Sequence, residues 1–121
     1  MVVDTNILID SLRGKADAVH FLESAETSYS ISVISVTELI AGIRGSSELG
    51  VVQDFLASFV IHPVDEATSK LAGEYLNRYF KSHQVGIADA LIAATATIHG
   101  EELATLNVKH FPMLGALVRP Y

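Results

Sequence analysis

Three carboxylates and one amide occupy positions where a strand is expected to give way to a helix or a turn. Asp4 follows a short apolar run, and Glu38 lies in the first turn of the helix expected after the second strand. Asp89 lies near the start of an apolar helix, and Asn107 follows the fourth expected strand. Carboxylate oxygens are preferred ligands of Mg²⁺ and Mn²⁺, and acids held close together repel one another unless a cation is present. The pattern predicts a divalent-metal site, which suits hydrolysis of a phosphodiester by an activated water.

Three of these residues also have a purely structural explanation. Asp4 is a good N-cap for the helix that follows it. Ser35 and Glu38 have the spacing of a capping box, in which the glutamate bonds back to the Ser35 amide. Asn107 is equally suited to cap the turn before Phe111. The sequence alone leaves these alternatives open.

Asp89 is harder to explain as a structural residue. It stands in the segment 86–94, which otherwise consists of Gly, Ala, Ile and Leu. Burying an unpaired charge there would cost several kcal/mol, whereas the helix dipole returns only about 0.5 to 1 kcal/mol. We therefore expect something cationic to meet Asp89.

Hydrophobic periodicity predicts five strands that alternate with helices. The clearest helix begins at Asp65 and Glu66, whose charges suit a first turn, and runs to about Ser82. Strands are expected at 2–3, 29–34, 59–64, 103–106 and 117–118, and helices between Asp4 and Gly14 and at 16–25, 35–44, 49–58, 65–82 and 86–99.

This alternation indicates the fold class α/β, a three-layer α/β/α sandwich. Crossover helices between strands imply a mostly parallel sheet covered on both faces. With 121 residues and no linker, repeat or low-complexity segment, the chain fits a single domain, residues 1–121. Ligands of such sheets gather outside the carboxyl ends of the strands, which is where the four polar residues are expected.

The composition indicates the cellular compartment and argues against several classes of ligand. No stretch approaches the roughly 20 apolar residues of a membrane span, and no basic segment precedes an apolar run at the start. Cysteine is absent, so we expect a cytoplasmic protein without membrane association. The net charge of −6 opposes broad electrostatic binding of nucleic acid, unless several acids converge on a metal. The five histidines have no ligand spacing, so a zinc site is not expected.

Four short motifs occur in order along the chain: Val3-Asp4-Thr5-Asn6, Ser35-Val36-Thr37-Glu38-Leu39, the segment 86–94, and Thr105-Leu106-Asn107 with Phe111 after it. Each motif is weak alone, but the ordered set is specific. Through them essentially the whole chain resembles PIN-domain proteins, in particular the VapC-like toxins of bacterial and archaeal toxin–antitoxin pairs.

This resemblance implies a PIN-like fold and a Mg²⁺- or Mn²⁺-dependent endoribonuclease that cuts cellular RNA. It also implies a homodimer and a small cognate VapB-like antitoxin bound across the active-site groove. By carry-over, the catalytic, metal-binding acids are Asp4, Glu38 and Asp89. Thr5 and Asn6 would orient the first acid, and Thr105 would support the end of the fourth strand.

The chain departs from the family pattern near its end. Many relatives carry a fourth acid where Asn107 stands, and often another where this chain has His110. An Asn side chain offers a metal or its water an oxygen but no charge, which puts a second metal ion in question. The alternative is therefore a catalytically weak or inactive PIN-fold module that binds RNA or protein, although retention of three acids favours the nuclease.

Two other enzyme classes fit less well. A receiver domain needs an acidic pair after strand one and a phosphoacceptor Asp after strand three, whereas strand one here ends in Asp4-Thr5-Asn6. A phosphatase of the haloacid dehalogenase type needs Asp-x-Asp after its first strand. Asn6 replaces the second acid, which would remove the general acid.

Overall fold

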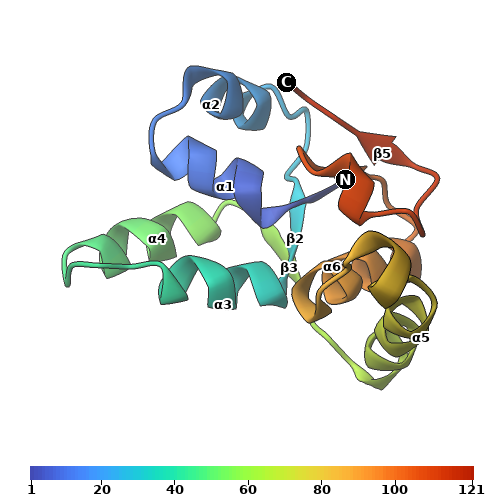
Figure 1. The fold of residues 1–121 in the computed structure, drawn as a ribbon. Coiled ribbons are helices and arrows are strands. Elements are labelled where there is room, and N and C mark those ends of the chain that lie inside the picture. The colour runs from blue at the N-terminus through green and yellow to red at the C-terminus, as the bar shows by residue number, and fades with distance from the viewer.

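Strand β1 lies at the centre of a five-stranded parallel sheet in the computed structural model, which describes residues 1–121. The strand order is β3-β2-β1-β4-β5, and every neighbouring pair is parallel. The predicted α/β/α class is therefore confirmed (Figure 1). In chain order the elements are β1 (Val2–Val3), α1 (Thr5–Leu12), α2 (Ala16–Glu23), β2 (Ser30–Ser32), α3 (Val33–Ala41), α4 (Glu48–Leu56), β3 (Val60–His62), α5 (Glu66–His83), α6 (Ile87–Ile98), β4 (Leu103–Ala104), the 3₁₀ turn η1 (Val108–His110) and β5 (Leu117–Val118).

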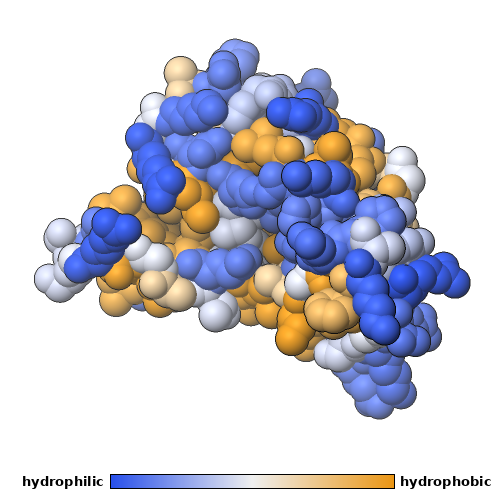
Figure 2. Space-filling model, viewed as in Figure 1, coloured by the Kyte–Doolittle hydropathy of each residue, from blue (hydrophilic) through white to orange (hydrophobic).

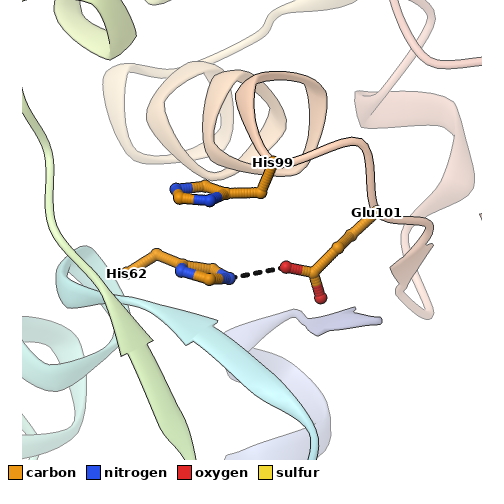
Figure 3. Close-up of side chains that lie close together, drawn as sticks. All are labelled: His62, His99 and Glu101. Atoms are coloured by element: carbon orange, nitrogen blue, oxygen red, sulfur yellow. Dashed lines mark hydrogen bonds and ion pairs between the residues drawn. The ribbon is translucent and has the colours of Figure 1, made fainter.

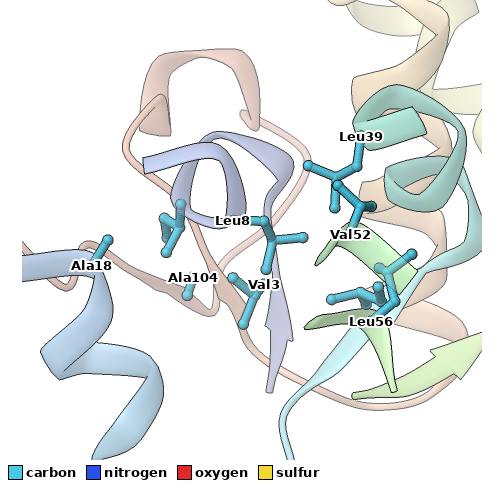
Figure 4. Packing of buried hydrophobic residues seen from close by; sticks show 9 residues of the cluster. Val3, Leu8, Ala18, Leu39, Val52, Leu56 and Ala104 are labelled. Carbon is cyan, nitrogen blue, oxygen red and sulfur yellow. The ribbon is translucent and has the colours of Figure 1, made fainter. Parts of the chain in front are cut away.

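The two residues of β1 point to opposite faces of the sheet, as alternation along a strand requires. Val3 belongs to a core that also contains Leu8 of α1, Ala18 of α2 and buried apolar side chains of α3 and α4 (Figure 4). Val2 packs on the other face against Ile92 and neighbouring residues of α6. Helix α5 covers α6 in turn, so α6 lies between the sheet and α5, which explains its nearly continuous apolar sequence.

The order in which successive strands are added to the sheet reverses beside β1, although all strands remain parallel. It runs from β1 through β2 to the edge strand β3, then returns through α5 and α6 to β4 on the other side of β1. The carboxyl ends of β1 and β4 thus flank the topological switch point, where parallel sheets of this kind bind their ligands.

Most element boundaries agree with the sequence prediction to within two or three residues. Helix α3 begins at Val33 rather than at Ser35, because β2 loses its strand partner after Ser32, which pairs with His62. Gly100, at φ +63°, follows α6 and reverses the chain toward β4. No helix combines the length and apolar character needed to cross a membrane.

Candidate active site

Asp4 anchors the switch point between β1 and β4. Its backbone N–H donates to the carbonyl of Ala104 at 2.9 Å, and the residue is only 3 % exposed. Carboxylate Oδ1 accepts the backbone N–H of Thr5 at 2.8 Å, so Asp4 does cap α1 as the structural explanation predicted. Oδ2 accepts the hydroxyl of Thr105 at 2.7 Å. Both oxygens are thus held by neighbours, one just after β4 and one at the start of α1.

The charge of Asp4 is not compensated by the protein. Burial raises its pKa to about 6 against the opposing effect of the hydrogen bonds from Thr105 and Thr5, and the nearby charges of Asp89 and Glu38 raise it further. No Lys or Arg forms an ion pair with any of the three acids. A buried carboxylate with two acidic neighbours and no basic one fits the ligand set of a divalent cation.

Glu38, in α3, is tied to Asp4 through Thr5. The Thr5 hydroxyl donates to Glu38 Oε1 at 2.8 Å. The same hydroxyl lies 2.8 Å from the Ser35 hydroxyl. Because a carboxylate only accepts, Thr5 gives its proton to Glu38 and accepts the proton of Ser35. One buried threonine therefore couples the start of α1 to the middle of α3.

This geometry contradicts the capping-box explanation of Glu38. The N-cap of α3 is Ser32, whose Oγ accepts the backbone N–H of Ile34 at 3.1 Å. Ser35 lies inside the helix and is fully buried. Glu38 is thus in the second turn, too far along the helix to cap it, and its exposed side chain meets Thr5 instead.

Asp89 lies in the first turn of α6, where the helix dipole favours a negative charge. Its carboxylate is 31 % exposed, so it carries less of the burial cost than the apolar sequence around it predicted. The nearest basic group is His110, whose Nδ1 lies 3.4 Å from Asp89 Oδ2. His110 belongs to η1, which follows β4, so this contact brings the segment after β4 next to Asp89.

The two asparagines lie at the rim of this arrangement. Asn107 is exposed, and its backbone N–H donates to Thr105 Oγ1 at 3.0 Å. Asn107 is the N-cap residue of η1, but its side chain makes no capping hydrogen bond there. Asn6 is half-buried in the first turn of α1. Both amide side chains are neutral, so neither offsets the negative charge of the acids.

The three carboxylates approach one another without forming a tight cluster. Asp89 and Glu38 are close enough to affect the pKa of Asp4, yet the three side chains do not bring one ligand oxygen each within 4.8 Å of the others. A separate group does meet that distance, formed by His62, His99 and Glu101. Sequence spacing gave no sign of it, because the fold alone brings these residues together.

A groove of about 460 Å³ opens beside Glu38 between α1, α3 and α4. Its walls are apolar except for a few charged residues, among them Arg13 and Arg44. Figure 2 shows apolar side chains gathered over the α3 and α4 arm, next to a polar region toward the centre of the molecule. The remaining lining residues are Ile9, Leu12, Leu39, Gly42, Ile43, Glu48, Val51 and Val52.

Comparison with known proteins assigns this arrangement to a family. The family described as PIN domain matches residues 1–112. Ribonuclease VapC10 of Mycobacterium tuberculosis is 44 % identical over 124 residues, covering 100 % of this chain and 92 % of that protein. Ribonuclease VapC19 of the same species is 38 % identical, covering 99 % and 98 %.

A solved structure has the same fold over nearly the whole chain. It is a toxin–antitoxin complex from Klebsiella pneumoniae, with a TM-score of 0.86 and 29 % identity. The match covers 99 % of this chain and 97 % of the matched chain.

Proposed function

Because this chain belongs to the PIN-domain family, we propose that it is a metal-dependent endoribonuclease and the toxin of a toxin–antitoxin pair. Its relatives at 44 % and 38 % identity are named ribonucleases, and a structural neighbour is a toxin–antitoxin complex. The observation that carries the proposal is Asp4, a buried and uncompensated carboxylate at the switch point, with Glu38 and Asp89 as its charged neighbours.

In this proposal Asp4, Glu38 and Asp89 hold Mg²⁺ or Mn²⁺, and the side-chain oxygen of Asn107 is an additional neutral donor. When bound, the ion supplies an activated water and stabilises negative charge on the phosphodiester. Three carboxylates overcompensate one divalent cation, so one neutral fourth donor is consistent with a single tightly held ion.

The supporting residues fix the acids before substrate arrives. Thr105 and the backbone of Thr5 hold the two oxygens of Asp4, leaving the remaining lone pairs for a ligand. The Thr5 hydroxyl orients Glu38. Asn6 follows in the first turn of α1, and in this proposal it helps to orient Asp4. Such partners orient metal ligands, and losing one typically costs roughly 10- to 100-fold in affinity or activity.

The nuclease is tested with a panel of single-stranded and structured RNAs, incubated with Mg²⁺, with Mn²⁺ and with chelator. The variants are Asp4→Asn and Asp89→Asn, and the matched control is Asp17→Asn, an exposed carboxylate on α2. We expect metal-dependent cleavage that the control retains and that both site variants lose by more than about 100-fold. Folded protein that cuts no RNA, or variants as active as the parent, would favour the binding-module alternative.

The groove beside Glu38 is the proposed binding site of a VapB-like antitoxin. A largely apolar groove lined also by two arginines and two glutamates, one of them Glu38, suits an amphipathic segment that covers the active site as it binds. Val51, on α4, lines the groove and is 61 % exposed, so it is free to contact such a segment.

Co-purification with an antitoxin encoded beside the gene tests this surface. Val51→Glu places a charge in the apolar channel and should weaken binding, while cleavage by the free protein stays unchanged. Val60→Glu on β3 is the control, since Val60 is also exposed but lies away from the groove. Equal capture by both variants would place the antitoxin elsewhere.

We further propose a cytoplasmic homodimer. Exposed apolar side chains outside the groove, Phe80 at 62 % and Ile87 at 69 % exposure, offer surface that a second copy would cover. Light scattering on the free protein should give about twice the chain mass of 13.0 kDa. A mass of one chain at micromolar concentration would refute the dimer.

A further inference from the structure

His62, His99 and Glu101 come together at the end of α6 remote from Asp89, the first from β3 and the other two from the connection between α6 and β4. His62 is the last residue of β3, His99 is the C-cap of α6, and Glu101 precedes β4. One ligand atom from each lies within 4.8 Å of the other two. Figure 3 shows the two imidazole rings one above the other with the Glu101 carboxylate beside them.

The contacts within this group are short. His62 Nε2 lies 2.5 Å from Glu101 Oε2, and the other carboxylate oxygen accepts the N-terminal ammonium of Met1 at 2.7 Å. The rings of His62 and His99 are stacked, with centroids 3.6 Å apart and planes 12° from parallel. Two imidazoles and one carboxylate therefore share a small volume, and no Lys or Arg is paired with them.

The surroundings favour a cation. His99 ends α6, where unpaired carbonyls give the helix terminus a partial negative charge. Asp65, the N-cap of α5, is an acidic side chain close enough to His99 to interact with its charge.

From this placement we propose that His62, His99 and Glu101 form a second metal site, selective for a borderline-soft ion with affinity for imidazole nitrogen such as Zn²⁺. Two imidazoles and a carboxylate are a recognised zinc ligand set, with a fourth position left to water. Mg²⁺ and Mn²⁺ prefer all-oxygen ligands, so the two sites differ in chemistry as well as in place. Asp89 and His99 are ten residues apart on α6, or about 15 Å along the helix axis.

Metal binding requires only local movement. Tetrahedral bonds of about 2.0 to 2.1 Å place ligand atoms roughly 3.3 Å apart. The hydrogen bond between His62 and Glu101 must therefore lengthen, and the exposed His99 ring must rotate out of the stack. The bound ion would tie the end of edge strand β3 to the end of α6 and the start of β4, which raises stability through mass action.

The test uses the untagged full chain carrying Asp4→Asn, which weakens the acidic site. Calorimetric titration with Zn²⁺ should show one equivalent bound, and Co²⁺ at the same site should give the visible absorption of a tetrahedral histidine site. Adding His99→Ala or Glu101→Gln should weaken Zn²⁺ binding by more than about 100-fold. His20→Ala, an exposed histidine on α2, is the matched control and should bind like the parent.

Either of two results would overturn the site. One is the absence of one-equivalent binding in the Asp4→Asn chain. The other is binding that survives both His99→Ala and Glu101→Gln, which would place the ion elsewhere. Circular dichroism of each variant shows that it is folded, and the RNA cleavage assay reports on the acidic site independently.

Discussion

Replacing Asp4 with Asn should stabilise the metal-free protein while abolishing its proposed activity. The folded-state pKa of Asp4 is about 6, against 3.8 for an unperturbed carboxyl. The folded state therefore binds the proton more tightly, and folding stability falls as pH rises from about 3.8 to about 6. At 1.36 kcal/mol for each pKa unit, the ionised carboxylate costs roughly 3 kcal/mol above pH 6.

The asparagine removes this charge but disturbs one hydrogen bond. Its oxygen can still accept the backbone N–H of Thr5, whereas its NH₂ group now faces the Thr105 hydroxyl that donated to Asp4. Thr105 Oγ1 already accepts the backbone N–H of Asn107, so its own proton would lack an acceptor. That mismatch costs about 1 kcal/mol, which leaves a net gain of roughly 2 kcal/mol at pH 8.

Urea denaturation at pH 8 and pH 4, each with chelator and with Mg²⁺, measures this difference. With chelator, Asp4→Asn should exceed the parent at pH 8, and the advantage should vanish by pH 4, where the parent is protonated. Mg²⁺ should stabilise the parent more than the variant. A variant less stable than the parent at pH 8 in chelator would refute the reasoning, because it would mean that burial of the ionised Asp4 carboxylate does not destabilise the folded protein.

Three further predictions concern Thr105, Gly100 and Phe111. Thr105→Val leaves a buried oxygen of Asp4 without its donor, so it should lower stability by about 1 to 3 kcal/mol and reduce cleavage, and Thr105→Ser should restore both in the same assays. Gly100→Ala should cost about 1 kcal/mol in urea denaturation with cleavage unchanged, since φ is +63° and no atom lies near the added methyl; no loss would argue against that backbone conformation. Phe111→Ala removes a fully buried ring and should cost about 3 to 5 kcal/mol, and a loss under 1 kcal/mol would show that the ring is not packed as described.

The elements of the fold were readable because local signals agree with the tertiary structure. Gly14 and Gly100 mark helix ends, and both have positive φ. The apolar segment that becomes α6 predicted burial between layers, which its position between the sheet and α5 explains. Local pattern and global packing point the same way in these segments, as expected of a sequence that specifies one fold.

The N-cap of α3 is Ser32 and not the expected Ser35, which shows that local sequence signals did not determine where this helix begins. Ser32 and Ser35 are both serines three residues apart at the start of one helix, and the Ser-x-x-Glu spacing favoured the second. The strand actually ends at Ser32 because its pairing with His62 ends there, and residues 30 positions away decide that register. Tertiary pairing, not the capping motif, fixed the helix start.

The candidate site was predicted in part. The strand-end rule predicted that Asp4 and Asn107 follow the strands at the ligand-binding edge of the sheet, and in the structure they follow β1 and β4. The supporting role of Thr105 came from the family resemblance and stays a prediction, although its hydroxyl does donate to Asp4. The link from Thr5 to Ser35 and Glu38 depends on how α1 and α3 pack, which spacing does not encode. The roles of these residues in catalysis remain predictions for the cleavage assay.

The pairing of β1 with β4 also bears on how the protein is made. Asp4 receives its hydrogen bond from Thr105, 101 residues later, and β1 gains one of its two neighbours only when β4 is available. A contact of such sequence separation forms late in folding and, during synthesis, only after residues 103–105 have left the ribosome. A nascent or prematurely terminated chain would therefore lack an assembled acidic site. For a toxin, this topology delays the harmful activity until β4 and Thr105 have been synthesised.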